Sequence, residues 1–336
     1  MKLGLYNAIL HDRPLADAIG VIADLGLTGI ELNTGGFLPP VHVPDIDQIL
    51  VSDAARDDFL GVFEGTGVQI AGLNCNGNPL HPNPVIGLKH AEDVRRSIRL
   101  AERLGQDRVV AMSGNPGDSA SSMTPNWIVN AWNSAALDVL DHQWQIVADF
   151  WRETDRLARA HGVKVALELH PQNVVFNCAS VHQLIELTHA TNVGVELDAS
   201  HLFWQQMDPV QVVRELGELV FHAAAKDVRI NPDTVALNGV LDNSFRRLSP
   251  DEPRTNLGGD EWANEWPKPS AWDFVALGKG HDVGYWTGFL RALYDVDPDM
   301  WVNIEHEDTE LDRVEGVAVA AEVLKAADAA LQPSLR

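Results

Sequence analysis

Cysteine is scarce in this sequence. Only Cys75 and Cys178 occur, far apart and outside any CxxC pair. A disulfide scaffold and a zinc site built from thiolates are therefore excluded. A chain with so little use for disulfides is typical of a reducing compartment, and we expect it to work in the cytoplasm.

Positive charge and long apolar runs are also in short supply. The chain has 25 Lys and Arg against 48 Asp and Glu, a net charge of −23. Such a field repels phosphates, so neither nucleic acid nor an anionic membrane is expected as a partner. No apolar run approaches the roughly 18 to 20 residues that span a bilayer. The first residues, MKLGLYNAILHDRPL, show no signal peptide, since they lack a basic region, a long apolar stretch and a cleavage site.

Glycine-rich phosphate loops are missing as well. Neither GxGxxG after an expected strand nor GxxxxGK[ST] occurs. This absence disfavours a dinucleotide-dependent enzyme and an NTPase. What remains is a chain with 45% apolar and 22% charged residues, which is typical of a globular protein with a large core.

The sequence contains eight repeats of a β-rich run followed by a segment with helical spacing. In the fourth such segment, Trp144, Val147, Ala148 and Trp151 make one apolar face at i, i+3, i+4 and i+7. Eight alternating units predict a (β/α)8 TIM barrel with a single catalytic domain over 1–336. The runs are 2–9, 29–34, 68–75, 108–114, 163–170, 192–200, 219–227 and 300–308.

Two connections are too long for simple loops of a barrel. They cover about 115–141, after the fourth strand, and about 228–282, after the seventh. Loops of this length are usually functional or disordered, and their tryptophans argue against disorder. Both follow the carboxyl ends of strands, where barrel enzymes build their sites. We expect them to form a lid or a partner surface.

Acids and imidazoles stand at the ends of the later strands. The fifth strand ends in Glu168-Leu169-His170, the sixth in Asp198 followed by His201, and the eighth carries Glu305. Each has a plain structural explanation: Asp198, for example, suits the cap of the next helix. As a set they predict a bound divalent cation, because isolated buried carboxylates are costly. Oxygen donors with an imidazole suit Mn²⁺, Mg²⁺ or Co²⁺.

These motifs resemble the xylose-isomerase-like barrel superfamily of sugar isomerases and epimerases. The resemblance covers nearly the whole chain and rests on DLGLTGIEL, VALELHP, VELDASHL, the KD of the seventh strand and NIEHED. It implies a metal site with Glu168, Asp198 and Glu305 as ligands. Where the family often reads HxHxKD, this chain has Ala224 at the position of the second histidine.

Another imidazole must then complete the metal site. We predict His281, in the turn GKGHD before the last helix, as the fourth ligand. His222 and His201 are the alternatives. His222 should lie one strand repeat deeper, roughly 6 to 7 Å further into the barrel.

The long second insertion, the GHD turn and NIEHED also resemble a narrower branch, the α subunits of bacterial C-glycoside deglycosidases. This resemblance implies a lyase that cleaves the bond between a 3-oxo-glucosyl unit and its aglycone, a Mn²⁺-type cofactor and a small β-sheet partner subunit. We also expect an oligomer.

The expected chemistry starts with removal of a proton next to a sugar carbonyl that the metal polarises. Elimination of the aglycone then requires an acid or base outside the metal ligands. The candidates are His142, His170 and His201. Trp127, Trp144 and Trp204 are candidates to stack on the substrate, although core packing explains each of them too. The alternative functions are a ketose isomerase or epimerase, an inosose-type dehydratase and a non-catalytic sugar-binding module.

Overall fold

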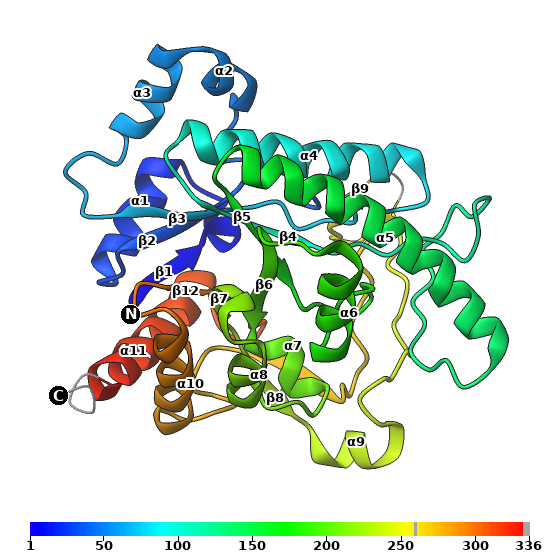
Figure 1. The fold of residues 1–336 in the computed structure, drawn as a ribbon. Coiled ribbons are helices and arrows are strands. Elements are labelled where there is room, and N and C mark those ends of the chain that lie inside the picture. Colours follow the sequence, from blue (N-terminus) through cyan, green and yellow to red (C-terminus); the bar gives the residue numbers. More distant parts are fainter. Residues whose placement is uncertain (259–260, 332–336) are drawn as a thin grey trace.

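Eight parallel strands close into a barrel in the computed structural model of the chain, which describes residues 1–258 and 261–331 (Figure 1). β1 pairs with both β2 and β12, with Leu5 beside Ile30 on one side and Ile304 on the other, and this closes the sheet. The predicted (β/α)8 barrel is confirmed. In order around the barrel, the strands are β1 (Lys2–Tyr6), β12 (Trp301–Ile304), β7 (Val220–Ala225), β6 (Val193–Asp198), β5 (Lys164–Glu168), β4 (Arg108–Met112), β3 (Gln69–Asn74) and β2 (Gly29–Asn33).

Helices pack around the outside of the barrel because each carries one apolar face. The predicted face of α5 is buried, and Trp151 is fully enclosed. Trp286 and Phe289 of α10 are equally inaccessible. The longer helices are α1 (Leu15–Asp24), α4 (Pro84–Arg103), α5 (Ser134–Ala160), α6 (Cys178–Thr188), α8 (Pro209–Leu216), α10 (Val283–Val296) and α11 (Arg313–Leu331). The shorter ones are η1 (Asn7–Leu10), α2 (Ile46–Val51), α3 (Asp53–Gly61), α7 (Ala199–Trp204), η2 (Gly217–Leu219) and α9 (Pro232–Asn238).

The first long connection is shorter than expected. α5 begins at Ser134, whereas the loop was expected to run to about residue 141. The Asn133 side chain accepts the backbone N–H of Ala136 and caps the helix there. The residues that follow are good helix formers, so the helix extends to this cap.

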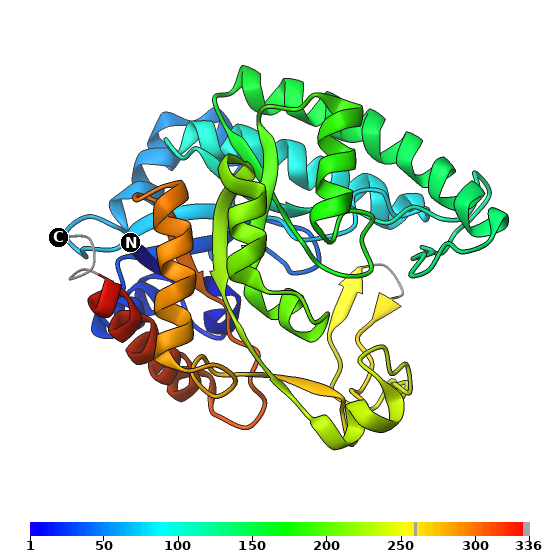
Figure 2. The ribbon, with the colours of Figure 1, turned by 60° about the horizontal axis from the view of Figure 1, so that its bottom comes forward.

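The second long connection contains structure of its own. β8 (Asp227–Ile230) pairs antiparallel with β11 (Trp272–Val275), and β9 (Asn256–Gly258) pairs with β10 (Glu261–Trp262). Figure 2 shows this segment, in yellow to orange, running past one end of the barrel. Among the described residues, no helix combines the length and the apolar character needed to cross a bilayer.

Candidate active site

The predicted site residues stand at one end of the barrel. Glu168 and Asp198 are the last residues of β5 and β6, and Lys226 and Glu305 directly follow β7 and β12. Parallel strands put their carboxyl ends at the same mouth. The strand pattern therefore brings these four side chains to one place.

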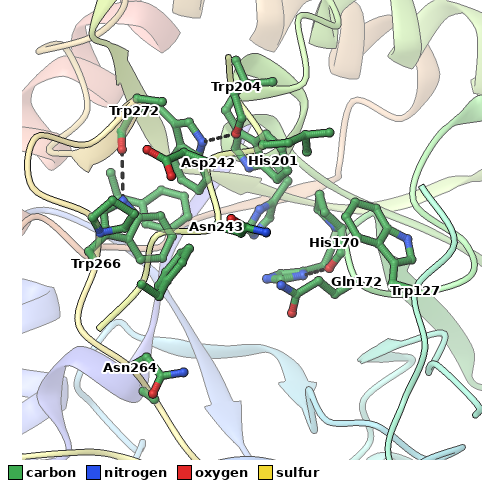
Figure 3. A pocket seen from close by; sticks show the side chains of 18 of the residues that line it. Trp127, His170, Gln172, His201, Trp204, Asp242, Asn243, Asn264, Trp266 and Trp272 are labelled. Atoms are coloured by element: carbon green, nitrogen blue, oxygen red, sulfur yellow. Dashed lines mark hydrogen bonds between the residues drawn. The ribbon is translucent and has the colours of Figure 1, made fainter. Parts of the chain in front are cut away.

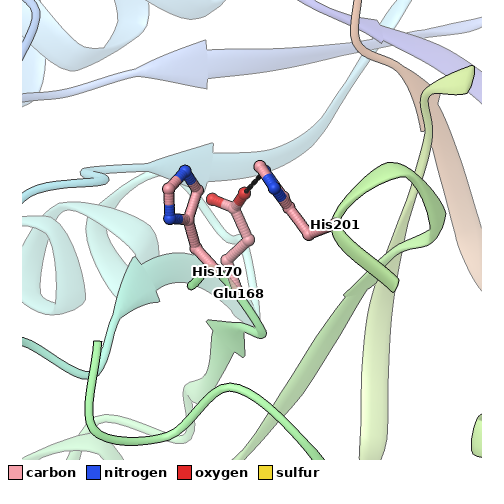
Figure 4. A group of neighbouring side chains, drawn as sticks. All are labelled: Glu168, His170 and His201. Carbon is pink, nitrogen blue, oxygen red and sulfur yellow. Dashed lines mark ion pairs between the residues drawn. The ribbon is translucent and has the colours of Figure 1, made fainter. Parts of the chain in front are cut away.

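Glu168 lies between two imidazoles. Its Oε1 is 3.1 Å from His201 Nε2, and its Oε2 accepts a hydrogen bond from Asn76 Nδ2. The His170 and His201 rings flank the carboxylate, with their centroids 4.0 Å apart (Figure 4). One ligand atom each from Glu168, His170 and His201 lie within 4.8 Å of one another.

Asp198 serves both as a helix cap and as a member of this group. Its Oδ1 accepts the backbone N–H of Ser200 at 2.8 Å, which caps α7. Its Oδ2 lies 3.3 Å from His201 Nε2. The structural and the functional interpretations of this residue are therefore compatible.

Lys226 is a buried cation at the same mouth. Its Nζ lies 2.9 Å from Glu305 Oε1, 2.9 Å from Glu307 Oε1 and 4.0 Å from Asp198 Oδ2. It also lies 4.2 Å from the centre of the Phe274 ring, a cation–π distance. The side chain is only 3% exposed, so several acids neutralise one enclosed ammonium group.

Burial and close charges shift the pKa values of this group. Burial alone would raise the pKa of Glu168, but the hydrogen bond from His201 and the charges of His201, His170 and Lys226 bring it down to about 2. Burial raises the pKa of Asp198 to about 7, although Lys226 acts in the opposite direction. Burial, and then His170, lowers the pKa of His201 to about 3, so this ring is neutral at physiological pH.

The Lys226 ammonium keeps its proton in this environment. Burial alone would lower its pKa, but Glu305, Glu307 and Asp198 hold that pKa well above its usual value. Burial pushes the pKa of Glu305 upward, against the effect of Lys226. The 2.9 Å contact between the two nevertheless has the geometry of an ion pair.

A divalent cation fits the donors at this mouth. Within the described chain, the buried Asp198 Oδ2 accepts no hydrogen bond. Glu168 and a neutral His201 converge beside it. Carboxylate oxygens with imidazole nitrogens suit Mn²⁺, Mg²⁺ and Co²⁺, and also Zn²⁺. Glu168 and Asp198 thus stay predicted ligands, whereas Glu305 is engaged by Lys226.

His281 is held by contacts with Asp227 and Phe203, and its role as the fourth metal ligand stays a prediction. Its Nδ1 lies 2.7 Å from Asp227 Oδ1, and its ring stacks on Phe203 with centroids 3.7 Å apart. Asp227 also accepts the backbone N–H groups of Gly278, Gly280 and His281. The GKGHD turn is therefore held around Asp227, which fixes the position of the His281 ring.

The two remaining histidine candidates have other surroundings. His222 points into the deeper barrel, where its Nε2 is 2.8 Å from Glu31 Oε2, as its strand position predicted. His142 lies on α5 and does not line the cavity that the described chain forms at the mouth. His170 and His201 do line it. Of the three predicted acid–base residues, two are therefore near the predicted metal ligands.

A cavity of about 740 Å³ opens over His170 and His201 (Figure 3). The second insertion supplies much of its wall, and Trp127 comes from the first insertion. Trp204 and Trp272 stack face to face at 4.8 Å, and Trp266 donates its indole N–H to the Trp272 carbonyl at 3.2 Å. The aromatic lining consists of Trp127, Trp204, Phe245, Trp262, Trp266, Trp272 and Phe274.

Several residues of the site carried little or no sequence signal. Of the tryptophans that could stack on the substrate or pack in the core, Trp144 packs in the core. Asn76 comes from the loop after β3, where nothing in its type or spacing marked it. Gln172 adopts a left-handed backbone, with φ of 67°, at the rim of the cavity. An unusual backbone of this kind is common near functional sites, but a sequence does not reveal it.

Comparison with known proteins identifies the family. The model of the xylose isomerase-like TIM barrel family matches residues 19–327. The chain belongs to this family. A relative from Bacillus subtilis (strain 168), the uncharacterized protein YfiH, is 32% identical over 329 residues, which is 97% of this chain and 98% of YfiH.

Solved structures of low sequence identity share the fold. The probable 3-DHS dehydratase AsbF of Bacillus anthracis has a TM-score of 0.62 at 15% identity, over 97% of this chain and 99% of AsbF. The 3-keto-D-glucoside 4-epimerase YcjR of E. coli has a TM-score of 0.61 at 13% identity, over 98% and 99%. Other neighbours are described as D-psicose and L-ribulose 3-epimerases, one protein with a bound zinc atom and one in complex with magnesium.

Proposed function

We propose that this chain is a metal-dependent sugar enzyme, the catalytic subunit of a C-glycoside deglycosidase. It would act on the 3-oxo form of a glucoside, remove the proton at C2 and release the aglycone from C1. The observation that carries this proposal is the aromatic cavity, which begins at His170 and His201 and is walled by five tryptophans and two phenylalanines.

The size and lining of this cavity favour a glycoside over a free monosaccharide. Its 740 Å³ lies in the range of pockets for drug-sized ligands. Indole faces stack on the apolar face of a sugar and on an aromatic aglycone alike. A single sugar ring would leave most of this aromatic surface in contact with water.

His170 is the residue best placed to remove the proton. Its Nδ1 contacts the carbonyl oxygen of Pro171, so Nδ1 carries the hydrogen and Nε2 keeps its lone pair. His170 is partly exposed and lines the cavity. A divalent cation bound by Glu168 and Asp198 would polarise the 3-oxo group and acidify the C2 proton.

In the proposed elimination, one proton moves from C2 to His170 and from His170 to the aglycone. His170 takes the C2 proton, and the electrons of that C–H bond form the enolate. The enolate then forms a C1–C2 double bond as the C1–aglycone bond breaks. The protonated His170 gives its proton to the ring carbon of the aglycone before this bond breaks, and the electron pair of the broken bond then stays with the ring and restores its aromaticity. No redox partner is needed, because the 3-oxo group enters with the substrate.

A sugar epimerase is the second candidate. An epimerase needs a base on each side of the carbon it inverts, and two imidazoles, those of His170 and His201, line the same cavity. The related fold of the 3-keto-D-glucoside 4-epimerase makes a 3-oxo-glycoside a reasonable substrate for this candidate also. An inosose-type dehydratase would share the first proton removal.

Product analysis separates these candidates. The purified chain, loaded with Mn²⁺, is incubated with a 3-oxo-C-glucoside in D₂O, alone and with a candidate small β-sheet subunit. Release of the aglycone supports the deglycosidase. Deuterium incorporation with an inverted sugar and no free aglycone would instead establish the epimerase, and loss of water would establish the dehydratase.

The same experiment tests the proposed assembly. We propose that a small β subunit completes the enzyme and that the complex is oligomeric. Aglycone release that occurs only with the partner present supports this arrangement. Full activity of the chain alone contradicts it.

A further inference from the structure

The second insertion forms another cavity beside the one over the proposed catalytic histidines. This second cavity has a volume of about 400 Å³, and Leu257, Trp262 and Asn264 line both spaces. The two cavities therefore meet at Trp262. His170 and His201 line the first cavity and do not line the second. A long ligand could reach from the histidines past Trp262 into the second cavity.

The positive charges of the second insertion fall into two groups. The insertion carries six lysines and arginines. Four of them form ion pairs with carboxylates, namely Arg229, Arg246, Lys268 and Lys279. Within residues 1–258 and 261–331, no carboxylate pairs with the other two, Arg247 and Arg254, and both of these line the second cavity.

The Arg254 guanidinium is oriented by an indole ring. It lies over the ring of Trp262, 4.0 Å from the ring centre, which is a cation–π contact. A guanidinium that stacks through its flat face keeps its N–H donors at its edge, where they match the two oxygens of a carboxylate. The wall shared by the two cavities thus offers an aromatic face and a planar set of donors together.

The acid that lines this cavity is directed elsewhere. Glu261 Oε1 lies 2.9 Å from Nε2 of His81, a buried residue in the loop after β3. Within the described ranges, no ion pair joins Glu261 to Arg247 or Arg254. The two arginines are therefore left to a negative charge that comes from outside. The chain as a whole, with a net charge of −23, repels anions, so a local pair of positive charges is needed to hold one.

We propose that the second cavity binds a carboxylate carried by the aglycone, with Arg247 and Arg254 as its partners. The preferred ligand is then a glycoside whose sugar lies over His170 and His201, whose aromatic rings lie among the tryptophans and whose negative charge lies beyond Trp262. This inference deepens the proposed function and rests on it for the glycoside nature of the ligand. The two arginines determine specificity and take no part in proton transfer.

Two probes that differ in one charge test the inference without turnover. They are 4′-(β-D-glucopyranosyl)biphenyl-4-carboxylate and its carboxamide, neither of them oxidised at C3, and their binding is measured by calorimetry. At about 10 mM NaCl the carboxylate should bind about fivefold more tightly, a modest factor because exposed ion pairs are weak. At about 1 M NaCl the screening length falls from about 30 Å to about 3 Å, and the preference should shrink to less than about twofold.

Substitutions then assign the preference to the two arginines. Arg247→Met and Arg254→Met should each reduce it, and the double variant should abolish it, with affinity for the carboxamide within about twofold of the wild type. Lys268→Met is the matched control, because Lys268 belongs to the same insertion, pairs with Glu265 and does not line the second cavity. This control should keep the full preference.

Three outcomes overturn the inference. The first is equal affinity of the wild type for both probes at low salt, which needs no variant. The second is a preference that survives in the double variant, because another part of the chain would then bind the charge. The third is a loss in Lys268→Met as large as that in Arg247→Met, which would assign the preference to net charge. Arg247 is exposed and Arg254 is half-buried, so the variants should melt at the wild-type temperature.

This test and the test of the proposed function fail separately. If the preference depends on the two arginines but the Mn²⁺-loaded chain neither releases aglycone nor exchanges the sugar proton, the proposed function is wrong and the carboxylate site stands. If aglycone is released from a 3-oxo-C-glucoside but the two probes bind equally, the proposed function stands and the carboxylate site is wrong.

Discussion

His170 carries most of the proposed chemistry at the scale of single residues. Replacing it with alanine should lower kcat by roughly 10² to 10⁴, the usual contribution of a general base. The rate of deuterium incorporation at the sugar carbon measures this step directly. His182→Ala is the control, because His182 lies on the surface of α6 and pairs with Glu215 at 3.2 Å. A His170→Ala variant that exchanges the proton at the wild-type rate would contradict the assignment.

His90 makes the stability of the barrel depend on pH. It is 1% exposed, and its Nδ1 accepts the backbone N–H of Asn78 at 3.0 Å, which only a neutral ring can do. Burial, followed by the charge of Lys89, lowers the pKa of His90 to about 4. The unfolded value is near 6.5, so the unfolded chain binds the proton more tightly. The contribution of His90 is complete above about pH 6.5 and is lost as the pH falls toward 4.

Urea unfolding of the wild type and of His90→Asn across this pH range measures the effect. The difference in the free energy of unfolding between the two proteins should shrink as the pH falls from 7 to 4, because asparagine does not titrate. A difference that stays constant over this range would show that the ring does not lose its neutral form.

The sequence predicted individual site residues only where a strand fixed their direction. Glu168 and Asp198 end strands and His170 follows two residues after β5, so their meeting place followed from the barrel. The surroundings of His281 could not be predicted because it follows no strand: its position depends on hydrogen bonds between the GKGHD turn and Asp227, which spacing does not encode. Lys226 was visible as part of a KD pair, but its contact with Glu305 depends on a side chain that reaches across the mouth.

At the scale of elements, the two insertions turn a barrel end into a pocket for aromatic groups. Trp127, from the first insertion, lines the cavity and packs edge-on against Phe176 with centroids 5.4 Å apart. Trp127→Ala should raise KM about tenfold for a 3-oxo-glycoside with an aromatic aglycone, since one stacking face is lost. Steady-state kinetics should show a smaller change for a 3-oxo-glucoside with a methyl aglycone.

A second tryptophan of the same insertion serves as the control. Trp132 is 85% exposed and does not line the described cavity, so Trp132→Ala should leave both KM values within about twofold of the wild type. An equal rise of KM for both substrates in Trp127→Ala would indicate a role in sugar binding or in folding, and would contradict contact with the aglycone.

Elements with a clear hydrophobic period were predictable, and those within the insertions were not. The β-rich runs and the apolar face of α5 follow from side-chain alternation and helical spacing. β8 and β11 are separated by more than forty residues of turns and short segments. Their pairing depends on where the barrel ends place them, so local spacing gave no sign of it. The start of α5 was missed because a cap, rather than the apolar pattern, sets it.

The excess of acid matters at the scale of the whole molecule. With a net charge of −23, repulsion among surface carboxylates opposes the folded state. Raising NaCl from about 10 mM to 150 mM shortens the screening length from about 30 Å to about 8 Å. The melting temperature in the presence of a chelator should rise, by about 1 to 2 °C for each kcal/mol of repulsion that is screened.

The chloride salt of a bulky cation provides the control for this measurement. Tetramethylammonium chloride screens charge but does not bind tightly to carboxylates, so it should reproduce the rise. A fall of the melting temperature with either salt would mean that the surface ion pairs contribute more to stability than the net repulsion removes.

The antiparallel pair of β8 and β11 has a consequence for how the cavity could be reshaped. β8 begins at the residue after Lys226, and β11 carries Trp272 and Phe274. The β8–β11 ladder therefore connects the aromatic lining of the cavity rigidly to the segment that carries Lys226. Substitutions in β11 that reshape the aromatic lining for a bulkier ligand should also shift the Lys226 ammonium group. A change in ligand selectivity should therefore be accompanied by a change in ion affinity. Transferring β8 and β11 together into another barrel should carry over the ligand selectivity without disturbing the ion affinity.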